Sequence, residues 1–152
     1  MKRVAYAVLS LIALTQLVEA KVTWTGRICI TSFAASCPAG DWEIACYNMT
    51  YRPAGVGDNG TATHFAFGND GFRYGLDLSS GNLVGTAYKP VSQTTVTAFG
   101  FTPSNVSLRF TSQKPSTLTA TTTSVEIVGN VKNIDGEIGC NLGFRAAGIR
   151  VP

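Results

Sequence analysis

His64 is the only histidine in the sequence, so any acid–base chemistry that needs an imidazole depends on this residue. A hydrolase would also need a nucleophile and a carboxylate that orients the imidazole. In a hairpin that pairs Phe67 with Phe72, Asp77 lies two positions beyond Gly75, the residue opposite His64. A surface histidine on the polar face of a strand explains the same residue without chemistry. We therefore expect a non-catalytic protein, with a hydrolase that uses His64 as an alternative.

The four cysteines, Cys29, Cys37, Cys46 and Cys140, are the next chemically informative residues. In an oxidising compartment an even number of cysteines predicts disulfides, and four cysteines allow three pairings. A zinc site would favour a Cys-x-x-Cys pair, which these spacings do not contain. Two glycine-rich segments carry too few carboxylates for calcium, and turn formation explains their composition. We expect two disulfides, no metal ion and no cofactor.

The first 20 residues have the three-part layout of a secretory signal peptide. Lys2 and Arg3 precede an apolar run over residues 4–14, and Val18 and Ala20 form a suitable cleavage site. The apolar run is short for a membrane span, and no later segment is apolar enough to cross a bilayer. We expect cleavage after Ala20, export to the periplasm or the medium, and no integral membrane segment in the remaining chain.

Composition indicates one domain that is rich in strands. Removing 20 of the 152 residues leaves 132, which is enough for a hydrophobic core. The net charge of +3 falls to +2 with the loss of Lys2, Arg3 and Glu19, and the remaining basic residues form no cluster, which argues against nucleic acid as a partner. Threonine, glycine, valine and aromatic residues dominate, while glutamate and lysine are scarce. The sequence therefore predicts a signal peptide over residues 1–20 and a single all-β domain over residues 21–152.

Alternation of apolar and polar residues, interrupted by turn residues, predicts about 8 to 10 short strands. The expected strands cover residues 22–31, 42–51, 63–67, 72–76, 83–89, 94–102, 106–112, 118–123, 125–132 and 138–149. Helical periodicity is not sustained over three turns after the leader, so no crossover helix is available to make neighbouring strands parallel. We predict an all-β antiparallel meander that closes into a small barrel stapled by disulfides, with a β-sandwich as the alternative.

Pairing of the first two expected strands selects one arrangement of the cysteines. In the register that makes one face of this hairpin apolar, the facing pairs are Trp24 with Tyr51, Ile28 with Tyr47 and Ile30 with Ala45. The same register places Cys29 directly opposite Cys46, which leaves Cys37 near the hairpin tip to pair with Cys140. The hydrophobic pattern and the cysteines thus agree on the disulfides Cys29–Cys46 and Cys37–Cys140.

Three features occur together in the chain: the stretch Tyr51-Arg52-Pro53-Ala54-Gly55-Val56-Gly57-Asp58-Asn59-Gly60, Cys37-Pro38 before it, and Cys140 near the end. In these features the chain resembles uncharacterised small exported bacterial β-proteins, a group without an assigned activity. The resemblance spans most of residues 21–152. It implies a location in the bacterial envelope and carries over no functional residue.

The predicted scaffold leaves three functions open. The first is a non-catalytic module that binds an envelope or extracellular partner through loops such as residues 53–60 and 112–116. The second is a small β-barrel that carries an apolar ligand among inward-facing aromatic side chains. The candidate ligand-binding residues are Trp24, Tyr47, Tyr51, Phe65 and Tyr74. The third is the hydrolase that uses His64. The many bulky inward side chains favour a filled interior, and therefore the first function.

We predict that the exported protein begins at Lys21 and carries both disulfides. Because each disulfide removes two hydrogen atoms, the mass before reduction should be about 4 Da lower than the mass after reduction. Mass spectrometry under denaturing conditions, with and without reductant, measures both quantities. An exported chain that retains residues 1–20, or a mass that does not change on reduction, would contradict this prediction.

Overall fold

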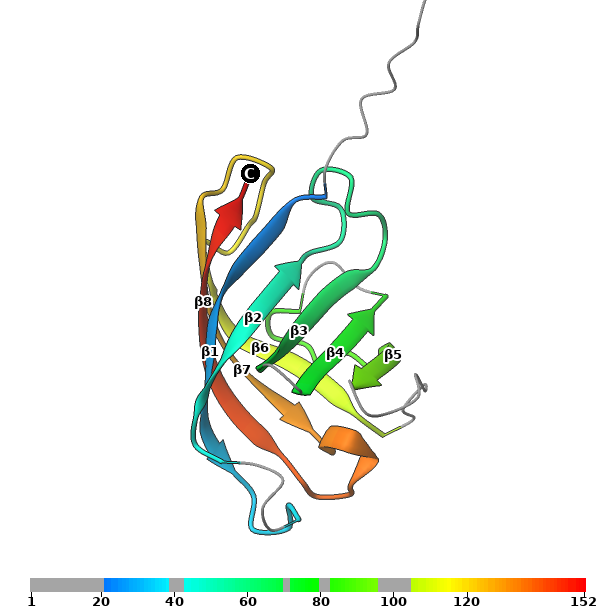
Figure 1. Cartoon of the computed structure of the whole chain (residues 1–152). Coiled ribbons are helices and arrows are strands. Elements are labelled where there is room, and N and C mark those ends of the chain that lie inside the picture. Colours follow the sequence, from blue (N-terminus) through cyan, green and yellow to red (C-terminus); the bar gives the residue numbers. More distant parts are fainter. Residues whose placement is uncertain (1–20, 39–42, 70–71, 80–82, 96–104) are drawn as a thin grey trace, which may run out of the picture.

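A computed structural model describes residues 21–38, 43–69, 72–79, 83–95 and 105–152, and the predicted signal peptide lies outside these ranges. The described chain forms eight β-strands and one short 3-10 turn, η1 (Figure 1). Their bounds are β1 Thr23–Phe33, β2 Cys46–Arg52, β3 Thr63–Asn69, β4 Phe72–Leu78, β5 Pro90–Thr95, β6 Ser107–Lys114, β7 Ser124–Lys132, η1 Ile134–Gly136 and β8 Leu142–Val151. The predicted all-β class is confirmed.

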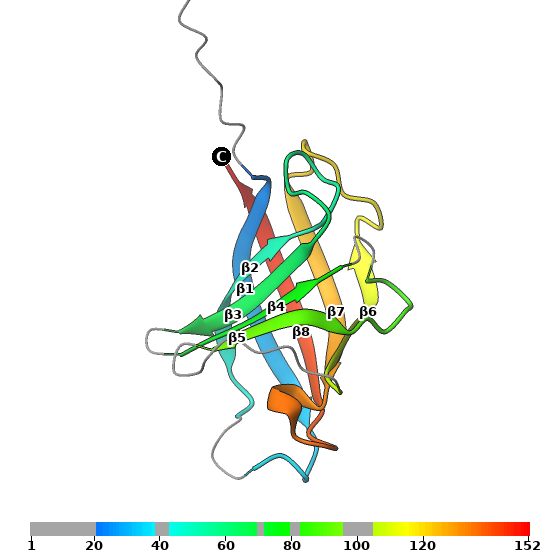
Figure 2. The same ribbon diagram turned by 90° about the vertical axis from the view of Figure 1, so that its right-hand side faces the viewer.

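All eight strands belong to one antiparallel sheet, in the order β5-β4-β3-β2-β1-β8-β7-β6. Strands that are neighbours in sequence pair with each other, except for β5 and β6, which form the two edges of the sheet. The first strand, β1, also pairs with the last strand, β8. Figures 1 and 2 show from two sides that this sheet curls around one interior. The structure is thus the predicted antiparallel meander, curled into a half-barrel and not divided into the two sheets of a sandwich.

The connection between β4 and β5 lies beside the edge strand β6. The amide of Phe110 donates to the carbonyl of Leu83 at 2.9 Å, and the amide of Gly85 donates to the carbonyl of Phe110 at 2.9 Å. Leu108 and Tyr88 exchange two further backbone hydrogen bonds, of 2.9 and 3.0 Å. β6 is therefore bonded on both sides, which reduces the exposed edge that an open sheet would otherwise leave for unwanted pairing.

The register predicted for the first hairpin is confirmed. Trp24 pairs with Tyr51 and Ile28 with Tyr47, and the amide of Ile30 donates to the carbonyl of Ala45 at 2.9 Å. The predicted cysteine pairing is also confirmed, because the disulfides Cys29–Cys46 and Cys37–Cys140 are both present.

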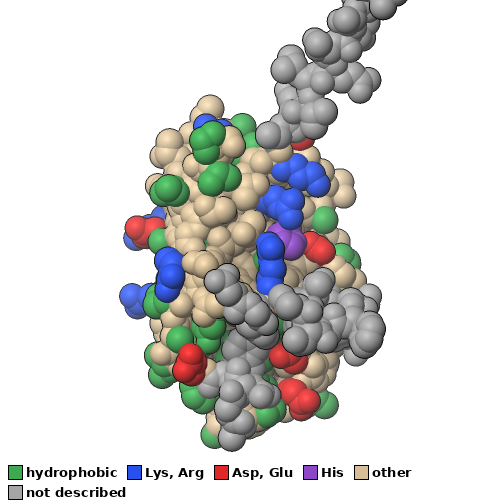
Figure 3. All heavy atoms as spheres, in the orientation of Figure 1, with side chains coloured by type: hydrophobic (Ala, Val, Ile, Leu, Met, Phe, Trp, Pro, Cys, Tyr) green, Lys and Arg blue, Asp and Glu red, His purple; other side chains and the backbone are tan. Residues whose placement is uncertain are grey.

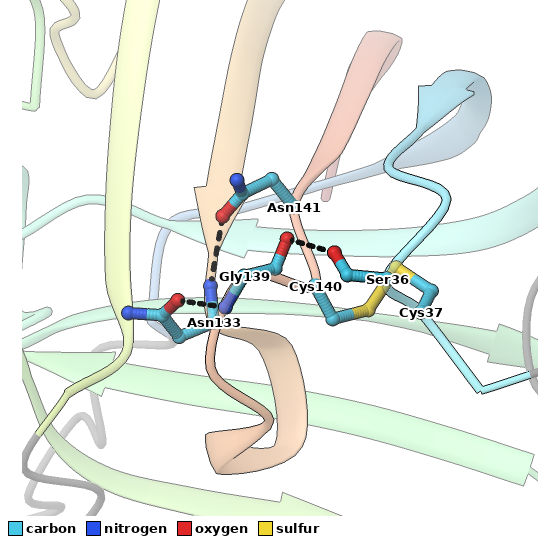
Figure 4. Close-up of a disulfide and its surroundings, with 6 residues drawn as sticks. All are labelled: Ser36, Cys37, Asn133, Gly139, Cys140 and Asn141. Carbon is cyan, nitrogen blue, oxygen red and sulfur yellow. Dashed lines mark hydrogen bonds between the residues drawn. A yellow bond between two sulfur atoms is a disulfide. The ribbon is translucent and has the colours of Figure 1, made fainter.

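The second disulfide joins two turns whose cysteines are 103 positions apart in the sequence (Figure 4). The Ser36 hydroxyl donates to the Gly139 carbonyl at 2.7 Å, and the Gly139 amide donates to Oδ1 of Asn133 at 2.8 Å. Asn133 has a left-handed backbone, with φ of 52°, which asparagine tolerates better than most residues. The first bond links the turn that carries Cys140 to the turn that carries Cys37, and the second lies within the Cys140 turn.

The register expected for the second hairpin is wrong by two residues. Phe67 faces Tyr74 and not Phe72, so His64 lies directly opposite Asp77. The pairing of Asn69 with Phe72 leaves only positions 70–71 between the strands. These positions read Asp-Gly, which is a signature of two-residue hairpin loops. A shift of two residues keeps each side chain on its expected face of the sheet.

Two of the expected strands and the beginning of a third are also corrected. Residues 83–89 form only isolated bridges, because Gly85 has φ of 80° and interrupts the extended backbone. Residues 118–123 form a turn in which the amide of Thr119 donates to the Thr122 hydroxyl at 3.0 Å, since threonine hydroxyls compete with the sheet for backbone groups. The last strand begins at Leu142 and not at position 138. Most of the strand expected over residues 94–102 lies outside the described residues.

β1 and β8 approach each other so closely that a side chain does not fit between them at one position. Gly26 pairs with Gly148, and a Cβ atom added to Gly26 would collide with the carbonyl oxygen of Ala147. Glycine therefore permits the contact that joins the first strand to the last.

We predict that the two disulfides stabilise the fold unequally. Cys37–Cys140 closes a loop of 103 positions, and Cys29–Cys46 closes a loop of 17 positions. In the chain-entropy account, replacing Cys37 and Cys140 by serine lowers the free energy of unfolding by about 4 to 5 kcal/mol, and replacing Cys29 and Cys46 lowers it by about 3 kcal/mol. Urea unfolding of the two double variants measures both values. The opposite order would contradict the entropic explanation.

Candidate functional site

The five aromatic residues proposed to bind a ligand lie inside the half-barrel and contact one another or shared neighbours. Trp24 and Phe65 are completely buried, and Tyr47 is the most exposed of the five at 8%. Ring centroids of Tyr51 lie 6.3 Å from Trp24 and 5.9 Å from Phe65, and Phe67 lies 6.1 Å from Tyr47 and 5.3 Å from Tyr74. Separations in this range are typical of aromatic rings packed against each other. These side chains form the hydrophobic core.

The two loops expected to bind a partner lie side by side at one end of the half-barrel (Figure 2). They enclose a hollow of about 220 Å³. Its lining residues are Tyr51, Pro53, Ala54, Gly55, Val56, Gln113, Ser116, Thr117 and Leu118. One loop follows β2 and the other follows β6, so strands that are distant in the sheet place these residues together.

Gln113 connects the floor of this hollow to its rim. The Tyr51 hydroxyl donates to Oε1 of Gln113 at 3.1 Å, and Nε2 of Gln113 donates to the carbonyls of Pro115 and Ser116, each at 3.2 Å. Burial raises the pKa of Tyr51, so its hydroxyl remains protonated and continues to donate at neutral pH. The loop after β6 is thereby held by the core residue beneath it.

The loop after β2, residues 53–62, is organised by its own hydrogen bonds. Nδ2 of Asn59 donates to the carbonyls of Val22 at 2.7 Å and Pro53 at 2.9 Å. Gly55 and Gly60, which both have positive φ, are joined by a 2.8 Å bond from the Gly55 amide to the Gly60 carbonyl. Glycine adopts this backbone region readily, so the sequence suits a tight and defined loop.

A row of polar side chains crosses four strands on the outer face of the sheet. The strand registers place Arg52 of β2 opposite His64 of β3, His64 opposite Asp77 of β4, and Asp77 opposite Ser92 of β5. Nδ1 of His64 lies 2.7 Å from Oδ1 of Asp77, and the Ser92 hydroxyl donates to Oδ2 of Asp77 at 2.8 Å. We call these four residues the polar row.

The charge of Asp77 is stabilised by its neighbours in the polar row. Partial burial by itself would raise the pKa of Asp77. Hydrogen bonds from His64 and Ser92, together with the positive charges of His64 and Arg52, outweigh this effect and hold the pKa below its usual value. Asp77 is therefore a stable carboxylate that orients the imidazole of His64.

The geometry of the polar row differs from that of a Ser-His-Asp catalytic triad. In a catalytic triad the nucleophile contacts the imidazole nitrogen that does not face the carboxylate. Ser92 instead donates to Asp77, and Nε2 of His64 has no hydrogen-bond partner among the residues that the structure describes. The arrangement of the described residues thus gives no support to the hydrolase alternative.

A small pocket of about 130 Å³ opens beside the polar row. Its lining residues are Lys21, Arg52, Asn59, Ala62, His64 and Asp77. Figure 3 shows the one histidine side chain between positively charged side chains and an acidic one on this face. Within the described part of the chain, three buried polar atoms of these residues lack hydrogen-bond partners: Nε of Arg52, Nε2 of His64 and Oδ1 of Asn59. We call this hollow the basic pocket.

Comparison with other proteins adds no known activity to this geometry. No family model, curated protein or solved structure matches the chain. The described residues contain no group of three or more side chains placed to hold a metal ion, and none of their helices is long and apolar enough to cross a membrane.

Sequence reasoning found His64 and Asp77 but missed Arg52, Ser92 and Lys21. Arg52 and Ser92 lie beside them only because three successive strand pairings are in register. The expected register of the second hairpin was displaced by two residues. The strand that corresponds to β5 was expected to begin at position 94, so it did not include Ser92. A reading of Asp-Gly at positions 70–71 as the hairpin loop would have placed Asp77 correctly.

We predict that Asp77→Asn lowers the free energy of unfolding at pH 7 by less than about 1 kcal/mol, because a pair this exposed is screened by solvent. The pKa of Asp77 is lower in the folded than in the unfolded chain, so its contribution is complete above the unfolded value of about 4. It is lost as the pH falls through the lowered folded pKa. Urea unfolding from pH 7 to pH 2.5 measures the difference between the two proteins. A difference that stays constant over this range would contradict the assignment.

Proposed function

We propose that this protein is an exported, non-catalytic binding module that acts in the bacterial periplasm or outside the cell. The proposed mature chain begins after Ala20 and recognises an envelope or extracellular partner through the loops after β2 and β6. The observation that carries the proposal is the hollow between these loops, which sits on a half-barrel whose interior is occupied by its own aromatic side chains.

The compartment is supported by the disulfides. Cys29–Cys46 and Cys37–Cys140 indicate an oxidising, non-cytoplasmic environment, because cytosolic thiols are normally kept reduced. The expected signal peptide is consistent with the same environment. Together with the resemblance to small exported bacterial proteins, these features favour the envelope or the medium.

The core favours a binding module over a carrier. A carrier of an apolar ligand needs interior space lined by apolar side chains. Tyr51, Phe65, Phe110 and Phe144 instead pack against one another at centroid distances of 5.5 to 6.3 Å. The aromatic residues therefore supply a rigid scaffold, and the surface remains for recognition.

The hollow between the loops suits the insertion of one partner side chain or a similarly small group. Val56 and Leu118 provide apolar contacts, while Gln113, Ser116 and Thr117 provide hydrogen-bonding groups. The bonds made by Gln113 and Asn59 fix both loops before a partner arrives. A site that is already ordered loses less conformational entropy on binding.

The test compares two arginine variants as baits for proteins in an envelope extract. Ser116→Arg adds a charged side chain at the rim of the hollow, and Ala35→Arg adds the same charge at an exposed turn at the other end of the half-barrel. We expect the unmodified chain and Ala35→Arg to recover the same partner. With Ser116→Arg, the amount of partner recovered should fall about tenfold or more, because a central contact is disrupted.

Two results would contradict the proposed function. One is equal recovery of the partner with both variants, because the hollow would then make no contribution. The other is the absence of any specific partner when a bound apolar molecule is found, which would favour the carrier. Circular dichroism of both variants controls for loss of folding.

A further inference from the structure

The basic pocket contains an arginine that the fold leaves incompletely paired. Arg52 is partly buried at the end of β2, and its Nε atom has no hydrogen-bond partner among the residues that the structure describes. A buried donor without an acceptor is costly, especially on a charged group. An acceptor that reached this nitrogen from the pocket, which Arg52 lines, would remove this cost.

His64 lines the same pocket and also has a nitrogen without a partner. Nδ1 contacts Asp77, and Nε2 is buried with no hydrogen-bond partner among the described residues. In a protonated imidazole both nitrogens are donors. The orientation of the ring is fixed in advance, as in other sites where a carboxylate positions a histidine.

We propose that the basic pocket binds an oxyanion, a sulfate, phosphate or carboxylate group, between Arg52 and His64. Lys21 lines the same pocket and adds a second permanent positive charge beside Arg52. Donors on positively charged side chains form the strongest hydrogen bonds to such groups. This site lies on the outer face of the sheet and does not depend on the hollow between the loops.

Asp77 is the one acidic residue that lines the pocket, and its charge is already engaged. One carboxylate oxygen contacts His64 and the other accepts from Ser92. Lys21 and Arg52 therefore outnumber Asp77, and in the proposed mature chain Lys21 also carries the α-amino group.

The size of the pocket limits the ligand to a small group. A volume of about 130 Å³ suits one oxyanion or the anionic end of a larger molecule. Asn59 and Ala62 form part of the wall, and both donor positions of the Asn59 amide are already used by Val22 and Pro53. The charged residues thus supply the donors that would determine binding.

The test titrates the unmodified chain with sodium sulfate at constant ionic strength, maintained with chloride. His64 is the only histidine, so the imidazole ring signals in NMR spectra can be assigned to it directly. We expect a saturable change in the ring signal as sulfate is added.

Three variants assign the response to the pocket, with backbone amide signals as the readout. We expect Arg52→Gln to weaken sulfate binding about tenfold or more and Arg52→Lys to weaken it less, since lysine keeps the charge but lacks the guanidinium donors. His64→Asn keeps a donor to Asp77 but removes the imidazole from the wall of the pocket, so it should weaken sulfate binding. Arg145→Gln, at an exposed position on β8, is the matched control and should change nothing.

A second arm replaces sulfate with phosphatidylglycerol vesicles and distinguishes a free oxyanion from a lipid headgroup. A saturable response to either probe that is lost in Arg52→Gln supports the site and identifies the source. A response that increases linearly with both probes, or one that Arg52→Gln and Arg145→Gln share, overturns the proposal. Failure of the loops to capture a partner would leave these outcomes unchanged, so the two proposals are tested separately.

Discussion

The pairing of the first strand with the last is the constraint on which the rest of the structure depends. β1 contacts β8 along most of its length and β2 along its other edge, so it holds the β2–β5 side of the sheet to the β6–β8 side. Gly26 permits the close approach of β1 to β8, and Cys37–Cys140 links the turns that follow β1 and precede β8. Because these strands come from opposite ends of the domain, this pairing closes a long loop. In the oxidised chain, the disulfide restricts the unfolded state and so removes much of the entropic cost of closing this loop.

The parts of the fold that the sequence predicts well are those in which two independent signals agree. In the first hairpin, the apolar alternation and the position of Cys29 opposite Cys46 require the same register, which the structure has. The second hairpin has alternation alone, and alternation is unchanged by a shift of two residues. Residues 83–89 and 118–123 have strand-like composition, but Gly85 and the threonine hydroxyls favour other local bonds. The polar row was not predictable in full, because it needs three registers to be correct at once.

The packing of the interior is the reason for placing the proposed binding sites on the surface. The aromatic residues that a carrier would use for its ligand are the ones that fill the core, and Tyr51 also supports the loop after β6 through Gln113. The end of β2 borders both hollows. Tyr51 lines the hollow between the loops. The adjacent Arg52 lies on the opposite face of the sheet and lines the basic pocket. Core packing, loop order and the position of the basic pocket are therefore linked through two consecutive residues.

The central claim is that the half-barrel encloses its own side chains and no apolar cargo. Native mass spectrometry of the protein recovered from the compartment where its host places it tests this most directly. The account predicts the mass of the bare, fully oxidised chain, alone or as an oligomer, with no apolar molecule that dissociates on denaturation. An apolar adduct that is present in the native spectrum and lost on denaturation would contradict the claim and identify the cargo.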